Sequence, residues 1–263
     1  MNAPVLVETK ENGVNIVTMN RPEYANASKP ELCLALAETL QKLNQDKTVK
    51  VIVLTGSGHF FSAGGDVKAM KERTDMFAGS PNDIRNSYRN IIHKVQLTIY
   101  NLDVPIIAAV NGAAAGAGND LVAVCDIAIA SEKAKFQETF VTIGLISGDG
   151  GSWLLPRVIG RSNAFLMAYT GEWFSAEQVK EMGLVWKVVP HDKLMEETLA
   201  LADSIAANPN GTVRATRRLI LESGQASFEA SLDLCASIQG GLHYTEGHQQ
   251  ALDHLLAKLA KKK

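Results

Sequence analysis

The sequence predicts an α/β fold, with a core of mostly parallel strands covered by helices and a helical C-terminal region. Apolar, β-rich segments alternate with helix-compatible segments through the first 190 residues, a pattern typical of parallel sheets covered on both faces. From about residue 190 onward no β-rich run occurs, and the remaining segments carry helical periodicity. The chain has 263 residues, of which 46% are hydrophobic, so it is long enough to bury a sizeable core.

The first elements are a predicted hairpin and a predicted helix. Asn12-Gly13 separates the β-rich residues 5–9 from residues 14–19, and Asn-Gly between two such runs is the strongest short hairpin signal. Residues 30–46 predict a helix, because Pro30 lies in the first turn and leucines recur at helical spacing.

Three apolar strands and further helices follow along the chain. The strands are expected at residues 49–55, 104–110 and 125–130, and a helix is expected at residues 84–101. Four helix-compatible segments complete the chain, at residues 190–206, 212–223, 228–240 and 245–259. We therefore expect a core over residues 1–200 and a helical region over residues 201–263.

Charge and composition exclude several classes of protein. The 26 Lys and Arg residues against 28 Asp and Glu residues give a net charge of −2, which disfavours a nucleic-acid partner because phosphate binding needs a clustered positive face. The longest apolar runs are far shorter than the roughly 18 residues that cross a bilayer, and the N-terminus lacks a secretory signal. The three cysteines (Cys33, Cys125, Cys235) are widely spaced, which predicts reduced side chains rather than disulfides or a metal site. We expect a soluble, cytoplasmic protein without a membrane partner.

Two glycine-rich bends are the main candidates for a functional site. Residues 59–67 follow the strand at 49–55, and residues 111–118 follow the strand at 104–110. Small residues let a backbone N–H approach a ligand closely, and two such N–H groups could hold one carbonyl oxygen as it gains negative charge. The alternative is that both bends are tight strand-to-helix turns that need small residues for packing. Neither a P-loop nor a Gly-x-Gly-x-x-Gly dinucleotide turn is present, since Leu121 stands where the third glycine would be.

Short segments over nearly the whole chain carry a familiar pattern. They are residues 20–22 (NRP) with 26–27 (NA), 61–68 (FSAGGDVK), 105–112 (PIIAAVNG), 116–118 (GAG), 125–126 (CD), 155–160 (LPRVIG), 170–171 (TG), 176 (A) and 183–185 (GLV). Together they resemble the enoyl-CoA hydratase/isomerase, or crotonase, superfamily. The resemblance implies a spiral of ββα turns that binds acyl-CoA over residues 1–200, with a C-terminal helical region that assembles a trimer or a dimer of trimers. It also implies an acyl-CoA thioester substrate and no metal or redox cofactor, because coenzyme A is part of the substrate.

The resemblance also implies residues for the site. The backbone N–H groups of Ala63 and Ala117 would hold the thioester oxygen and so stabilise an enolate. The substrate-binding residues that it implies are Ala25, Ala63, Gly64, Gly65, Asp66, Ala117 and Phe140.

The acid–base residues depart from the pattern of the hydratases, in which two glutamates flank a water molecule. Asp120 stands at the position of the first glutamate, which makes it the leading acid–base candidate; the alternative is an aspartate that accepts the free N–H groups of a helix start. Phe140 stands at the position of the second glutamate and cannot transfer a proton. Glu138 lies two residues away and is expected to be a solvated charge at a strand end. Asp149 is the second candidate, with an ordinary Asp-Gly turn residue as its alternative.

These residues favour one reaction over others. Removing a proton next to a thioester requires that the enolate charge be held, and a carboxylate in an apolar pocket then moves the proton. One carboxylate suffices to shift a double bond, whereas adding water calls for a second group. We therefore favour double-bond isomerisation of an enoyl-CoA over hydration. Decarboxylation, hydrolysis and a non-catalytic acyl-CoA-binding role remain alternatives. His59 could contact a phosphate of CoA, although a surface-loop histidine is the commoner outcome. The other five histidines, His93 among them, lack ligand spacing and receive no chemical role.

Overall fold

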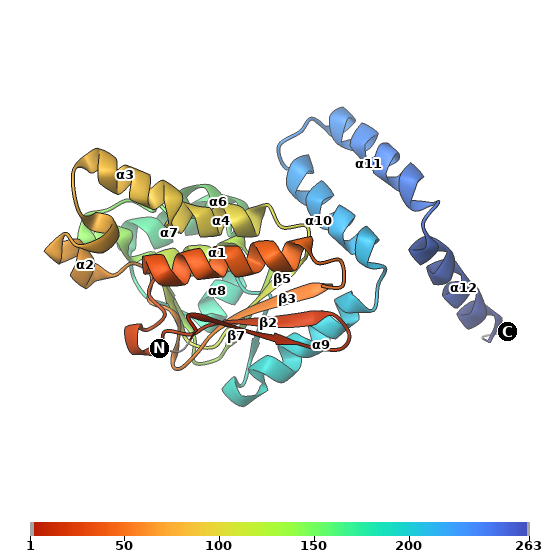
Figure 1. Ribbon diagram of the computed structural model, residues 1–263, viewed down its shortest axis with the longest axis horizontal. Helices are drawn as coiled ribbons and strands as arrows, with labels where there is room; N and C mark the ends of the chain where they lie inside the picture. Colours follow the sequence, from red (N-terminus) through yellow and green to blue (C-terminus); the bar gives the residue numbers. More distant parts are fainter. Residues whose placement is uncertain (1–2, 262–263) are drawn as a thin grey trace.

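The computed structural model describes residues 3–261 of the chain (Figure 1). Met1, Asn2, Lys262 and Lys263 lie outside the described residues, and with them the first two residues of the core expected at 1–200 and the last two of the helical region expected at 201–263. Within the described part, no helix is both long enough and apolar enough to cross a membrane.

The centre of the fold is a six-stranded sheet within residues 3–261. Its strands run in the order β1, β2, β3, β5, β7, β10, with bounds Val5–Thr9, Val14–Met19, Val51–Gly56, Ile106–Val110, Ile127–Ser131 and Lys187–Val189. β1 and β2 form the predicted hairpin and pair antiparallel, whereas every other neighbouring pair in this sheet is parallel. The predicted hairpin and the mostly parallel core are therefore confirmed.

A smaller four-stranded sheet lies beside the first. Its order is β4 (Phe60–Ser62), β6 (Ala113–Ala115), β8 (Lys135–Gln137) and β9 (Phe174–Ser175). Three central strands of the first sheet are each followed along the chain by a short strand of the second: β3 by β4, β5 by β6 and β7 by β8. This repeated step from sheet to sheet, followed by helical segments, is the predicted spiral of ββα turns.

The helices cover the sheets and continue beyond them. Their bounds are α1 Pro30–Gln45, α2 Val67–Glu72, α3 Pro81–Asn90, α4 Ile92–Tyr100, α5 Ala117–Val124, α6 Gly151–Val158, α7 Gly160–Thr170, α8 Ala176–Met182, α9 Leu194–Ala206, α10 Asn210–Ser223, α11 Phe228–Leu242 and α12 Glu246–Ala260, with short 3₁₀ turns η1 Pro22–Tyr24, η2 Asp75–Phe77, η3 Thr139–Ile143 and η4 His191–Lys193. The single helix expected at residues 84–101 is instead two helices that meet at Ile91. That expectation was wrong because the apolar periodicity of α4 continues the pattern of α3 without a breaking residue, so the break has no local signal.

Two apolar layers hold the six-stranded sheet. Because successive side chains of a strand point to opposite faces, Ile52 and Leu54 of β3 join one cluster with α1 and α4. Val51 and Val53 of the same strand join the other cluster with α9. Figure 1 shows α1 and α4 on one side of this sheet and α9 on the other.

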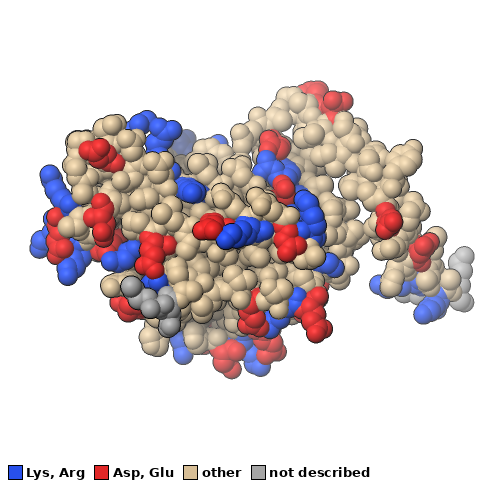
Figure 2. Space-filling view, viewed as in Figure 1, with Lys and Arg blue, Asp and Glu red and all other residues tan. Residues whose placement is uncertain are grey.

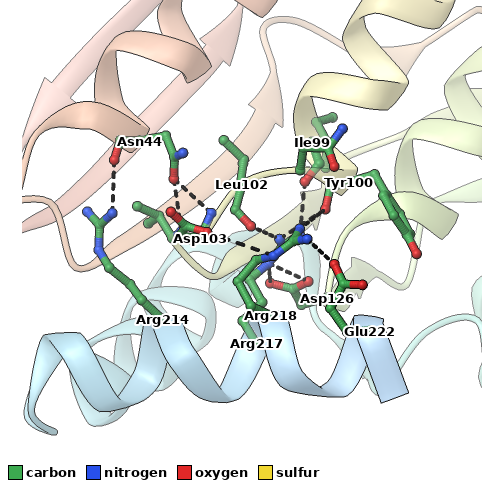
Figure 3. A network of polar contacts seen from close by, with 12 residues as sticks. Asn44, Ile99, Tyr100, Leu102, Asp103, Asp126, Arg214, Arg217, Arg218 and Glu222 are labelled. Carbon is green, nitrogen blue, oxygen red and sulfur yellow. Dashed lines mark hydrogen bonds and ion pairs between the residues drawn. The ribbon is translucent and has the colours of Figure 1, made fainter. Parts of the chain in front are cut away.

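After α9 the chain moves away from the sheets, and arginine side chains of α10 hold this helix to the core (Figure 3). We call these side chains the arginine anchor. Arg217 Nε donates to both oxygens of Asp126 at 2.8 and 2.9 Å, and its other nitrogens donate to the carbonyls of Ile99, Tyr100 and Leu102. Arg214 donates to carbonyls at the end of α1 and in the segment before β3. These bonds fix α10 to the core, and α11 and α12 extend from it as a projecting arm (Figure 1). The boundary expected between residues 200 and 201 falls within α9.

Candidate active site

The two glycine-rich bends meet in space because their strands, β4 and β6, are parallel neighbours. Their backbones touch. A Cβ added to Gly64, which has a φ of +78°, would lie 2.3 Å from the Ala115 carbonyl oxygen, and one added to Gly118 would lie 2.3 Å from that of Ser62. Glycine is therefore required at both positions for packing, as the alternative interpretation of the bends states. Gly64 itself is filled on this side by the Ala115 carbonyl, and the cavity between the two bends lies beside it.

A cavity of about 230 Å³ opens where the two bends meet, and we call it the bend cavity. Its walls are mostly apolar and aromatic, with one carboxylate: Phe60, Ala63, Gly65, Val67, Met70, Tyr88, Ile92, Ala115, Gly116, Gln137, Thr139, Phe140, Ile143, Asp149 and Trp173. A concave apolar site with a few polar groups is the usual form of a small-molecule site. Of the predicted binding residues, Ala63, Gly65 and Phe140 lie in its wall.

The backbone amides of the bends differ in whether they are free. The Ala63 N–H donates to the Ala25 carbonyl at 2.9 Å, so the prediction that the Ala63 amide holds a substrate oxygen is wrong. The Gly64 N–H donates to Ser62 Oγ at 3.2 Å. The Gly65 N–H, one residue further on, has no hydrogen-bond partner within residues 3–261.

The second bend supplies a free amide where it was predicted. Ala117 is the first residue of α5, and the first N–H groups of a helix have no partner inside the helix. No other group in the described chain accepts its hydrogen. The Ala117 nitrogen lies directly beside the first bend, 3.2 Å from a Cβ built on Gly64. The two bends therefore present the amides of Gly65 and Ala117 as available donors.

Asp149 is the carboxylate in the wall of the bend cavity. It lies just before α6 and is 3% exposed. Burial, together with the nearby charge of Glu138, raises its pKa to about 7. No described residue donates a hydrogen bond to its Oδ1, so the alternative of a carboxylate that only stabilises a turn finds no support. A carboxyl group with a pKa near neutrality that faces a cavity is suited to moving protons.

Asp120 lies behind the cavity wall rather than in it. Its side chain is fully buried, and a Cβ added to Gly151 would lie 2.2 Å from Asp120 Oδ1. Burial raises its pKa well above the ordinary value, and the neighbouring Glu138 carboxyl raises it further. No side-chain or α5 backbone donor makes a well-formed hydrogen bond to either oxygen, so Asp120 does not satisfy the helix start. The leading acid–base candidate from the sequence is thus sealed off from the bend cavity.

The environment of Glu138 differs from the one that the sequence predicted. Glu138 was predicted to be a solvated charge, but it is 1% exposed. Asn119 Nδ2 donates to one of its oxygens at 2.8 Å, and Ser147 Oγ donates to the other at 2.7 Å. The residue follows β8, whose pairing with β6 turns this end of the strand toward α5. A single charged residue at a strand end gives no sign of such burial, which explains why the sequence missed it.

The remaining predicted residues serve the first bend from outside. Ala25, at φ +51°, supplies the carbonyl that engages the Ala63 amide. The Asp66 side chain begins α2 by accepting the N–H groups of Lys68 and Ala69 at 3.1 Å, and it pairs with Lys29 Nζ at 2.9 Å. That hydrogen bond with Lys29 is the main reason that the pKa of Asp66 is lowered. Both side chains line an open groove of about 510 Å³ that shares Ala63, Gly65 and Val67 with the bend cavity.

Two further side chains near Asp149 had no signal in the sequence. Tyr88 lies in the wall of the bend cavity, and burial raises its pKa. His93 Nε2 lies 3.0 Å from the Gly148 carbonyl oxygen and 3.9 Å from Asp149 Oδ1, so His93 orients the turn that carries Asp149. Among the residues that the structure describes, no group of three or more His, Cys, Asp or Glu side chains could hold a metal ion.

Known proteins share both this sequence pattern and this fold. The family model described as enoyl-CoA hydratase/isomerase matches residues 9–252. The chain is 35% identical over 248 residues to the 1,2-epoxyphenylacetyl-CoA isomerase of Escherichia coli, covering 94% of both proteins. It is 32% identical over 253 residues to the 2,3-dehydroadipyl-CoA hydratase of the same species, covering 96% of both. Among solved structures, an enoyl-CoA hydratase from Mycobacterium smegmatis superposes with a TM-score of 0.91 at 31% identity, over 98% of this chain and 97% of that one.

Proposed function

This chain belongs to the enoyl-CoA hydratase/isomerase family, and on that premise we propose that it shifts a double bond in an enoyl-CoA thioester by way of an enolate. One observation carries the choice of isomerisation: the described wall of the bend cavity contains a single carboxylate, Asp149, together with Gly65, whose amide is free. A single carboxylate can remove a proton from one carbon and return it to another. Phe140 occupies the wall where a second carboxylate would be needed to activate water.

The proposed mechanism uses these groups in order. The N–H groups of Gly65 and Ala117 donate to the thioester oxygen, which gains negative charge as the proton leaves. Ala117 also lies at the positive end of the α5 dipole, which favours the same charge. The Asp149 carboxylate accepts the proton from the acyl chain and, once protonated, returns it at the far end of the shifted double bond. With a pKa near 7, Asp149 can take part in both steps at neutral pH.

The two hollows suit the two parts of an acyl-CoA. The bend cavity has apolar and aromatic walls that suit the acyl group. The adjoining groove is mixed in charge: Lys29 and Lys68 line it together with Asp66, Glu72 and Asp75. Lys29 is paired with Asp66, so Lys68 is the lysine of the groove whose charge suits a phosphate of coenzyme A. The hollows share Gly65, so a thioester that spans both would place its reacting carbonyl beside this amide.

Assembly and setting are part of the proposal. We propose a homotrimer or a dimer of trimers in which α11 and α12 lie at interfaces, because neither helix buries a single residue within the chain. We also propose a cytoplasmic protein that needs no metal or redox cofactor and has no nucleic-acid or membrane partner. Lys, Arg, Asp and Glu side chains are interspersed on the visible face of the core (Figure 2), which supports the absence of a nucleic-acid partner.

The test of the reaction is a comparison of products. The protein is incubated with 2-enoyl-, 3-enoyl- and 3,5-dienoyl-CoA, while double-bond position and 3-hydroxyacyl-CoA are followed. We expect an isomerised enoyl-CoA without a hydroxy product, and loss of the reaction in Asp149→Asn but not in the exposed control Asp192→Asn. A 3-hydroxyacyl-CoA product would instead establish hydration, which the hydratase names among the relatives make the second candidate. Binding of acyl-CoA without turnover of any thioester would identify a non-catalytic relative.

A further inference from the structure

Three carboxyl groups lie together behind and in the wall of the bend cavity. They are Asp120 on α5, Glu138 before η3 and Asp149 before α6, and each is at most 3% exposed. No Lys or Arg pairs with any of them within residues 3–261. Three buried negative charges without a cation would repel one another strongly, so protons must be shared among these groups.

The surroundings of Asp120 and Glu138 decide which of the two holds a proton. Asn119 Nδ2 and Ser147 Oγ both donate to Glu138, and such bonds favour the charged form of a carboxyl group. No comparable side-chain donor reaches Asp120, which is also the more deeply buried of the two. Burial and the neighbouring Glu138 carboxyl accordingly raise the pKa of Asp120 well above its usual range, which favours the protonated form of Asp120. The pair then carries a single negative charge, on Glu138.

We propose that Glu138 is a positioning residue: Ser147, two residues before Asp149, donates to Glu138 at 2.7 Å, and the buried negative charge held beside this turn controls how readily Asp149 gives up its proton. The proposal rests on the proposed function only in assigning the proton transfer to Asp149. Glu138 touches no substrate in this arrangement, because it is absent from the wall of the bend cavity. It acts through Asp149, whose negative form its charge opposes.

The other titratable groups that face Asp149 leave Glu138 as the decisive charge. Burial raises the pKa of the Cys33 thiol on α1 to about 12 and raises that of the Tyr88 hydroxyl on α3, so both are neutral near pH 7. Asp120 on α5 is neutral because it holds the shared proton. His93 on α4 lies 3.9 Å from Asp149 Oδ1 and contacts the Gly148 carbonyl at 3.0 Å. A positive charge on His93 would favour the charged form of Asp149, so His93 is not the group that raises the pKa of Asp149. Besides burial, the Glu138 charge is the cause that raises the pKa of Asp149.

The test measures the pKa of Asp149 directly, without substrate. Protein labelled with ¹³C at the aspartate carboxyl carbons is titrated by NMR, and the Asp149 signal is assigned by its absence in Asp149→Asn. Asp120→Asn mimics the protonated form of Asp120 and should leave the pKa of Asp149 unchanged. Asp120→Asn combined with Glu138→Gln removes the remaining charge and should lower the pKa of Asp149 by about one unit. Glu132→Gln, at an exposed glutamate, is the matched control and should cause no shift.

Each variant can overturn the proposal by itself. If Asp120→Asn alone lowered the pKa of Asp149 by about one unit, the negative charge of the pair would lie on Asp120 instead of Glu138. An unchanged Asp149 pKa in the folded double variant would show that the Glu138 charge does not reach Asp149. Restoring the charge with Asp120→Asn plus Glu138→Asp should return the Asp149 pKa toward that of the wild type, which a merely structural role of Glu138 would not do.

An activity readout separates this inference from the proposed function. If isomerisation occurs, the acidic limb of the kcat profile should move to lower pH in the double variant by the same shift as the NMR titration. If the NMR shift is seen but no isomerisation occurs, the inference about Glu138 stands and the proposed function fails. If the kcat profile moves while the Asp149 signal does not, the inference fails and the proposed function stands.

Discussion

The two bends and the C-terminal arm differ in which side chains they bury and which they expose to solvent. Around the bends even carboxyl groups are buried: Asp120 is fully buried, and Glu138 and Asp149 are almost fully buried. On the arm of α11 and α12 even large apolar side chains are exposed, including Phe228 at 74% and Tyr244 at 94%. Figure 2 shows this arm as mostly uncharged surface.

This difference in burial indicates that the two regions have different functions. Burying carboxyl groups costs folding free energy unless they are paired or protonated, so their retention beside a cavity points to chemistry at that place. Leaving apolar side chains in contact with water also costs free energy, and an apolar surface of this kind is typical of an interface with another protein. The bends are thus buried within one chain, whereas the exposed apolar side chains of the arm are the surface that the proposed assembly would cover. The following predictions test this contrast, from the largest expected effect to the smallest.

Asp149→Asn should lower kcat by about 10³- to 10⁴-fold, because it removes the group that moves the proton while keeping the shape of the side chain. The measurement is isomerisation of an enoyl-CoA at saturating substrate. Asp192→Asn, at an exposed position, should retain full activity. A kcat within threefold of the wild type would remove Asp149 from the mechanism.

The dependence of stability on pH should reveal Asp149 in the absence of substrate. Its pKa is raised from about 4 in the unfolded chain to about 7 in the folded protein, so the folded state binds this proton more tightly than the unfolded state. The stabilisation is complete below about pH 4 and is lost as the pH rises through 7. Between these values the wild type should lose roughly 4 kcal/mol of unfolding free energy relative to Asp149→Asn. Denaturant unfolding at a series of pH values measures this difference, and parallel curves would contradict the raised pKa.

Ala117→Pro should lower kcat by about 10²- to 10³-fold, the usual cost of losing one oxyanion donor. Proline at the first position of a helix removes only an N–H that has no partner within the helix, so the fold should persist. Ala117→Ser keeps the N–H and serves as the control. If Ala117→Pro folds and remains fully active, the amide of Ala117 has no part in catalysis.

Arg217→Leu should destabilise the protein by about 3 kcal/mol, because Asp126 and three backbone carbonyls lose their buried partner. Arg218→Leu is the matched control on the same helix. Its exposed pair with Glu222 should contribute less than about 1 kcal/mol. Chemical denaturation of both variants gives the comparison, and equal losses would mean that the anchor of Figure 3 does not hold α10 to the core.

The smallest effect on the stability of the chain is expected on the arm. Leu252→Glu with Leu256→Glu places charges on exposed positions of α12 and should change the unfolding free energy of the separated chain by no more than about 0.5 kcal/mol. Sedimentation velocity should nevertheless show a trimer or hexamer for the wild type and single chains for the double variant. An unchanged oligomer, or a wild type that is already monomeric, would contradict an interface at α12.

Local patterns in the sequence were sufficient for much of the fold. Asn12-Gly13 predicted the hairpin of β1 and β2, and the alternation of apolar strands with helices predicted that most strands of the sheet are parallel. The small residues of the two bends predicted where their backbones approach each other, because only glycine leaves room for the Ala115 and Ser62 carbonyls. These features depend on neighbouring residues or on a simple repeat, so the sequence alone contains their cause.

The state of individual polar groups was decided only by the tertiary structure. Whether the Ala63 amide is free depends on the Ala25 carbonyl, and whether Glu138 is solvated depends on Asn119 and Ser147 from other segments. The placement of Asp120 behind Gly151 and of Asp149 in the cavity wall has the same origin. Hydrogen bonding and burial are properties of groups that meet in space, so a pattern along the chain specifies where the bends lie but not which of their atoms remain available.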